Sequence, residues 1–121
     1  MLEDVSIPEE GHITVDDLIG AWESFQGDGL HGWTYHVLVF CRDRDRIVLQ
    51  TWMPQKKGDS IGKLSLQATK GTNCMPIGNG LLLRVEGWMT IELQPVEGGR
   101  LRRTMPGTTA GAVYFRRIVL P

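Results

Sequence analysis

The side chains best suited to nucleophilic or metal chemistry in this chain are three histidines and two cysteines. No pair among His12, His31 and His36 has a short metal-ligand spacing, and Cys41 and Cys74 form no Cys-x-x-Cys motif. The chain also lacks a Gly-x-Ser-x-Gly elbow, a phosphate loop and a dinucleotide fingerprint. We therefore expect no metal and no cofactor, and the sequence assigns no catalytic residue.

His36 is the histidine that lies within a predicted strand. It can share that strand with Cys41, but residues five apart project from opposite faces, which excludes a simple nucleophile–base pair. Two interpretations of His36 stay open. It is either an outward-facing strand histidine, or an acid, a base or a hydrogen-bond donor to a ligand.

Arg84 and Glu86 lie two residues apart in an apolar stretch and share a face with Trp88. They are either solvent-facing polar residues or an inward pair that orients a ligand against an aromatic wall. Tryptophan is large and carries a polar N–H group, so it often lines ligand sites and interfaces, with core packing as the alternative. The four tryptophans of the chain are Trp22, Trp33, Trp52 and Trp88.

Basic and acidic residues are nearly balanced, at a net charge of -1, which gives no overall attraction to nucleic acid or anionic lipid. Positive charge is nevertheless concentrated in the last quarter of the chain, at Arg100, Arg102, Arg103, Arg116 and Arg117. A basic patch there can meet an acidic partner. Aromatic residues that could stack on nucleic-acid bases do not interleave with these arginines, so we expect no nucleic-acid partner.

The pattern of apolar residues favours short strands along most of the chain. Strands are predicted over residues 21–26, 33–41, 46–53, 61–69, 81–93, 101–104 and 112–120. Glu86-Gly87 is either a bend within one strand or a turn between two. Residues 70–80 contain three glycines and a proline and are predicted to be irregular. Thr14, followed by Asp17 at capping-box spacing, predicts one helical turn over residues 15–19.

Seven or eight short strands with short links predict an all-β fold in a single domain. Closure into a small up-and-down antiparallel barrel removes the exposed sheet edges. A sandwich of two sheets is the alternative, but it usually needs longer crossover connections. We expect residues 1–13 to be a flexible tail and residues 14–121 to form the barrel domain.

The triplet Gly20-Ala21-Trp22, after a predicted helical turn and at the start of the first strand, resembles the opening of lipocalin-like proteins, the calycin barrels. In that family the tryptophan closes the bottom of the barrel, and an arginine near the end of the last strand packs across it. Arg116 and Arg117 stand where that arginine is expected. No histidine follows His36, which argues against a heme-binding nitrobindin-like barrel.

An inward Trp22 places Ser24 and Gln26 on the same interior face by alternation. The candidate ligand-binding residues are Trp22, Ser24, Tyr35, Trp52, Arg84 and Trp88. The sequence favours binding of a small apolar or aromatic ligand inside the barrel. A barrel-type cyclase or isomerase acting on a hydrophobic small molecule is one alternative, and a filled barrel serving protein interaction, as in inhibitors or immunity proteins, is another.

The segment from Val37 to Phe40 is apolar on both faces. One face fills the barrel, and the other requires cover from the N-terminal segment or from a second subunit, so we expect a homodimer. Uninterrupted apolar runs do not exceed four residues, and residues 1–15 hold four carboxylates and no apolar block. We therefore expect no membrane association and a cytoplasmic protein with reduced thiols at Cys41 and Cys74.

Overall fold

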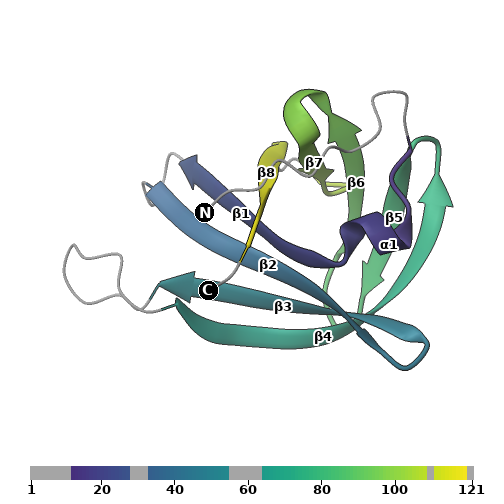
Figure 1. Cartoon of the computed structure of the whole chain (residues 1–121), viewed down its shortest axis with the longest axis horizontal. Helices are drawn as coiled ribbons and strands as arrows, with labels where there is room; N and C mark the ends of the chain where they lie inside the picture. Colours follow the sequence, from purple (N-terminus) through teal and green to yellow (C-terminus); the bar gives the residue numbers. More distant parts are fainter. Residues whose placement is uncertain (1–11, 28–32, 55–63, 109–110, 120–121) are drawn as a thin grey trace.

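Eight antiparallel strands follow one another around a closed barrel in the order of the chain (Figure 1). The computed structural model describes residues 12–27, 33–54, 64–108 and 111–119. The strands are β1 (Gly20–Gly27), β2 (Trp33–Asp43), β3 (Arg46–Pro54), β4 (Leu64–Ile77), β5 (Gly80–Val85), β6 (Thr90–Val96), β7 (Arg100–Thr104) and β8 (Val113–Ile118). Pairing of β1 with β8 closes the sheet. The predicted all-β up-and-down barrel is thus confirmed.

The segment predicted to be irregular is instead part of the longest strand. β4 runs without a break to Ile77, which pairs with Gly80 across a two-residue turn, so the prediction for residues 70–80 is wrong. The Arg46–Glu86 ion pair lies against the backbone of Gly71 on the outer face, and only a residue without a side chain leaves room for it. A Cβ atom at Gly71 would collide with the side chains of both Arg46 and Glu86. Glycine therefore marks a close approach here, not a turn.

Glu86-Gly87 forms a turn between two strands, which settles the alternative left open by the sequence. The Glu86 amide donates to the Gly71 carbonyl oxygen at 3.0 Å, and Gly87 takes the left-handed φ of 67°. Glycine adopts such a φ at no steric cost. The turn separates β5 from β6 and leaves the Trp88 side chain exposed.

The helix α1 (Val15–Leu18) carries the predicted capping box. The Asp17 amide donates to Thr14 Oγ1 at 3.3 Å, and the Thr14 amide donates to Asp17 Oδ2 at 2.9 Å. Ile13, just before this cap, is only 2% exposed, and its amide donates to the Asn79 carbonyl oxygen. Ile13 therefore belongs to the barrel and not to the predicted tail; residues 1–11 lie outside the described residues.

Trp22 and Arg117 close the end of the barrel beneath α1. The Trp22 side chain is fully buried, and its Nε1 donates to the Leu18 carbonyl oxygen at 2.9 Å. The Arg117 guanidinium carbon lies 4.7 Å from the centroid of the Trp22 ring, within the range of a cation–π contact. Arg117 also donates to the carbonyl oxygens of Ile19 and Asp17. Of the two arginines that the sequence offered, Arg117 is thus the one that lies across the tryptophan.

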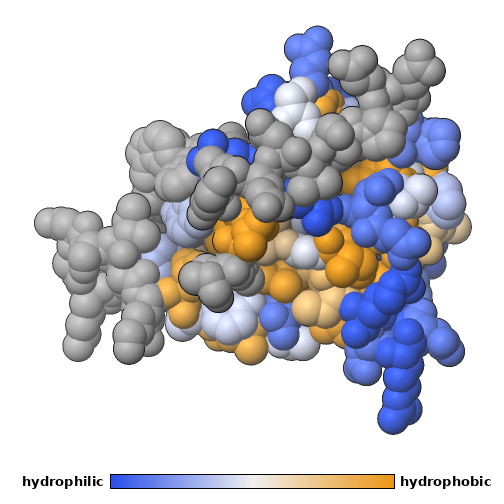
Figure 2. Space-filling model, viewed as in Figure 1, coloured by the Kyte–Doolittle hydropathy of each residue, from blue (hydrophilic) through white to orange (hydrophobic). Residues whose placement is uncertain are grey.

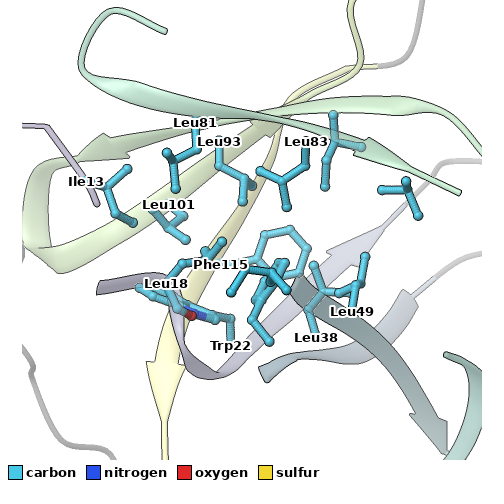
Figure 3. Close-up of a cluster of buried hydrophobic side chains, with 14 residues drawn as sticks. Ile13, Leu18, Trp22, Leu38, Leu49, Leu81, Leu83, Leu93, Leu101 and Phe115 are labelled. Carbon is cyan, nitrogen blue, oxygen red and sulfur yellow. The ribbon is translucent and has the colours of Figure 1, made fainter. Parts of the chain in front are cut away.

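The core fills the barrel from this closed end to its middle. Figure 3 shows leucines from opposite walls pointing to a common interior, with Phe115 between them. All of these side chains follow the period-2 alternation of their strands, which turns every second residue inward. The buried cluster comprises Ile13, Leu18, Trp22, Leu38, Phe40, Ile47, Leu49, Leu81, Leu83, Val85, Ile91, Leu93, Leu101 and Phe115.

The outer face of β1 and β2 is also buried in places. Val37 has no exposed surface within the single chain, although it pairs with Glu23 on the outside of the barrel. No second subunit is needed to cover Val37, and the homodimer stays a prediction. Figure 2 shows further apolar surface over β2, β3 and β4, beside a hydrophilic β2–β3 turn.

Replacement of Trp22 by alanine should destabilise the protein by about 3–5 kcal/mol, the range for large aromatic-to-alanine changes in a core. The substitution removes a fully buried ring together with its contacts to Arg117 and Leu18. Urea unfolding followed by circular dichroism measures the change. The control is Trp88→Ala, at a side chain that is 47% exposed, which should lose less than about 1 kcal/mol. An equally small loss for Trp22→Ala would contradict the role of Trp22 as the barrel floor.

Candidate binding site in the barrel interior

Three polar side chains from three strands face the interior above the apolar core. They are Ser24 of β1, His36 of β2 and Arg103 of β7, here called the interior polar cluster. Ser24 pairs directly with His36, and Arg103 pairs with the fully buried Leu93. Directly opposite residues in an antiparallel pair share one face of the sheet. The register therefore turns all three toward the inside.

Phe115 is the common neighbour of His36 and Arg103. Its ring centroid lies 5.2 Å from that of His36 in an edge-to-face arrangement, at an interplanar angle of 83°. The Arg103 guanidinium carbon lies 5.6 Å from the same ring. One aromatic ring of the packed core thus contacts both an imidazole and a guanidinium.

Two polar atoms of this cluster lack hydrogen bonds among the described residues. Ser24 is only 2% exposed, and neither its hydroxyl oxygen nor the Nε of Arg103 makes a hydrogen bond. No carboxylate in the part of the chain that the structure describes forms an ion pair with Arg103. A buried polar group without a hydrogen bond costs about 1–3 kcal/mol, and native proteins contain few of them. Such a cluster needs an explanation other than stability.

Burial and mutual repulsion determine the protonation of these groups. Desolvation, followed by the nearby positive charge of Arg103, lowers the pKa of His36 to about 4. Desolvation also lowers the pKa of Arg103, but a guanidinium in a protein remains protonated. At neutral pH the cluster therefore presents one positive charge, one neutral imidazole and one hydroxyl.

Charge along the strands is sorted by face. Within the eight described strands, the carboxylates are Glu23, Asp43 and Glu92, and the register turns all three outward. Lys70, which pairs with the buried Leu49, and Arg103 both have inward register. The described interior is consequently positive, although the protein as a whole carries a charge of -1.

Two of the six residues predicted to bind a ligand do lie inside. Ser24 belongs to the interior polar cluster, as alternation from Trp22 predicted. Trp22 itself faces inward, but it lies at the closed end beneath the core. The side chain of Gln26, predicted on the same face, lies outside the described residues.

Tyr35 and Trp52 lie on the outer face, so their predicted inward direction is wrong. Tyr35 neighbours the inward His36, and its hydroxyl donates to Glu23 Oε1 at 3.0 Å. Burial and this hydrogen bond raise the pKa of Tyr35 to about 12. Trp52 pairs with the outward Val37 and donates from Nε1 to Gln50 Oε1 at 3.1 Å. If the inward residues of a strand are assigned one position out of register, every side chain of that strand is placed on the wrong face of the sheet.

Arg84 and Trp88 are exposed and belong to no interior wall. The buried neighbours of Arg84, Leu83 and Val85, take the inward positions of β5, so the inward interpretation of Arg84 is wrong. Glu86 does not accompany Arg84 either, because it forms an ion pair with Arg46. The solvent-facing alternative for this polar pair is the correct one.

Sequence reasoning missed Arg103 and left the direction of His36 open, with the outward position as the common case. A usable signal was present in β7. Leu101 is the one apolar residue of that strand, and alternation from an inward Leu101 carries Arg103 inward as well. Alternation also turns His36 inward, because Leu38 pairs with the inward Trp22 and His36 lies two residues from Leu38 on the same strand.

Other chemistry finds little support among the described residues. No three His, Cys, Asp or Glu side chains there gather as a metal site would require. Cys41 and Cys74 are free thiols; Cys41 has outward register, whereas Cys74 packs against the core. No helix in the described ranges has the length and apolar character needed to cross a bilayer.

Because the pKa of His36 is lowered by burial, the unfolded chain takes up its proton first as the pH falls. The contribution of neutral His36 is therefore complete above about pH 6.5 and is lost between about pH 6.5 and pH 4. Urea unfolding at about pH 7.5 and pH 4.5 should show wild type losing about 2–3 kcal/mol more than His36→Gln over this interval. Equal losses in the two proteins, or a midpoint near pH 6.5 for His36 by NMR, would contradict this assignment.

A scan against protein-family models, a search of curated proteins and a search of solved structures gave no match for this chain. No relative therefore assigns a role to Ser24, His36 or Arg103. Any function of the interior rests on the geometry and chemistry of these residues.

Proposed function

We propose that this protein binds a small, largely apolar molecule inside its barrel, with the polar part of that molecule at the interior polar cluster. The observation that carries the proposal is the Ser24 hydroxyl, which is buried without a hydrogen-bond partner among the described residues, as is the Nε atom of the inward-facing Arg103. Ligand sites typically combine apolar walls with a few convergent polar groups that fix orientation. Ser24, His36 and Arg103 supply such groups next to the ring of Phe115.

The energetics favour a ligand over a purely structural role. Apolar residues of similar volume at Ser24 and Arg103 would fill the interior without desolvating a hydroxyl and a cation. A partly satisfied polar network is less stable than an apolar core. A ligand that completes the hydrogen bonds recovers this cost on binding, which is how a buried polar site is reconciled with a folded barrel.

The closed end supports a lipocalin-like assignment within the same proposal. The stack of Arg117 on Trp22 after a single helical turn has the form that the resemblance to that family implies. In such barrels the closed end provides a rigid floor and the opposite end admits the ligand. The interior polar cluster lies on the open side of the core, where an entering molecule would meet it.

A filled barrel that serves protein interaction is the second candidate. It is favoured by the dense core, in which Trp22, Phe40 and Phe115 are each at most 1% exposed. In that case the interior has no room for a ligand, and the functional surface is the outer face of the barrel. Ligand titration separates the two functions, because a filled barrel offers no saturable interior site.

The neutral fluorescent dye N-phenyl-naphthylamine should bind saturably at one molecule per chain. Backbone and side-chain NMR signals of Ser24, His36 and Phe115 should shift, while those of the exposed Tyr114 on the outer face should not. Ser24→Leu should weaken binding by about tenfold or more, equivalent to about 1.4 kcal/mol, because the larger side chain occupies the site.

The matched control is Thr69→Leu, which makes a similar change at an exposed position on β4 that pairs with the outward Gln50. This variant should bind the dye as wild type does. Near-ultraviolet circular dichroism establishes that both variants are folded. Absence of saturable binding, or shifts confined to outer residues, would overturn the ligand proposal in favour of the filled barrel.

A further inference from the structure

We propose that the ligand of this barrel is a compact organic anion, whose carboxylate or similar oxyanion is held by Arg103 with Ser24 and His36 as additional donors. This inference rests on the proposed function and adds the charge, the size class and the orientation of the molecule. It follows from the charge that the interior leaves uncompensated, from the donors around that charge and from the position of the packed core.

The first step concerns charge. Arg103 is partly buried next to Phe115, where desolvation lowers its pKa, and it forms no ion pair within the described part of the chain, while every carboxylate of the described strands faces outward. A cation taken out of water without a counter-charge is costly, and the cost is offset when an anion binds beside it. Lys70, with its inward register, reinforces the same sign. The interior thus favours an anionic ligand over a neutral or cationic one.

The second step concerns the donors. A guanidinium offers N–H groups in a planar fork that matches the two oxygens of a carboxylate. The Ser24 hydroxyl has no hydrogen-bond partner among the residues that the structure describes and can donate to a ligand, and neutral His36 has one ring N–H group. Burial keeps the pKa of His36 at about 4, so it adds a donor without adding a second buried positive charge. All three groups therefore serve an acceptor-only group, as a carboxylate is.

The third step concerns size and orientation. The core leucines beside the cluster are at most 4% exposed, so the packed core has no space for the ligand on that side. They are Leu38, Leu83, Leu93 and Leu101. The apolar body of the ligand must extend from Phe115 toward the open end, past the half-buried Val113 that pairs with Arg103. The anion enters first and the body stays nearer the mouth. This geometry suits a compact molecule better than a long acyl chain.

Two dyes that differ only in one anionic group test the charge of the ligand. Anilinonaphthalene sulfonate is N-phenyl-naphthylamine with an added sulfonate, whose oxygens stand in for those of a carboxylate. Isothermal titration of wild type should give about 10- to 100-fold tighter binding of the sulfonate dye, the range expected for hydrogen bonds to charged groups. The sulfonate dye should also raise the pKa of His36 measured by NMR, because it places a negative charge beside the imidazole.

Arg103→Gln should abolish this preference, so that the two dyes bind this variant with affinities within about threefold of each other. The control is Arg102→Gln, the same charge change one residue earlier, where the side chain faces outward and donates to Gln94. It should keep the full preference. Arg103→Gln should not reduce the free energy of unfolding, since it removes a partly desolvated charge that no described side chain neutralises.

The outcomes separate the two proposals. Binding of both dyes with equal affinity, or an anion preference that survives Arg103→Gln, overturns the anionic ligand while the apolar-ligand function stands. Loss of the preference in Arg102→Gln as well would assign it to general surface charge and overturn the role of Arg103. Failure of both dyes to bind removes the proposed function itself, and this inference with it.

Discussion

Closure of the sheet by pairing of β1 with β8 is the constraint on which the rest of this structure depends. Once the barrel is closed, each strand residue faces either a confined interior or the outside, and the period of 2 leaves no intermediate position. Trp22 and its cross-strand partner Arg117 lie at this seam. Their stack fixes the floor and sets the parity of β1 and β8 together. The positions of Ser24 and Phe115 follow from that parity.

The architecture could be predicted because its signals are local and repeated. Short apolar runs, turn residues and the Thr14–Asp17 cap each point to the same barrel, so an error over one segment, such as residues 70–80, left the fold unchanged. The site was harder to predict because it depends on parity. The direction of Tyr35, Trp52 and Arg84 reverses with a shift of one residue, and no local signal fixes such a shift. Alternation counted outward from Trp22 was reliable for Ser24, which is close to it in the chain.

The interior polar cluster and the apolar core place opposite demands on the same small volume. Leucines and aromatic rings stabilise the barrel by removing apolar surface from water, whereas Arg103 and Ser24 lose hydration without full compensation. The two demands are separated along the barrel axis. The core includes Trp22, which Arg117 covers, and its partner Leu38, whereas Ser24 and His36 lie two residues farther along β1 and β2. Stability and binding can then be supplied by different residues.

The other buried charges of the barrel show that the isolation of Arg103 is not a general property of this fold. Glu23, only 8% exposed on the outer face, accepts hydrogen bonds from Tyr35 at 3.0 Å and from Arg116 at 2.6 Å. Arg117, which has the same inward register as Arg103, also has a buried Nε without a hydrogen bond among the described residues, but its two terminal nitrogens donate to backbone carbonyl oxygens. The chain thus supplies partners for a carboxylate outside and for a guanidinium at the floor. Within the described residues Arg103 has only the ring of Phe115, so its counter-charge is best sought in a molecule that the chain does not itself contain.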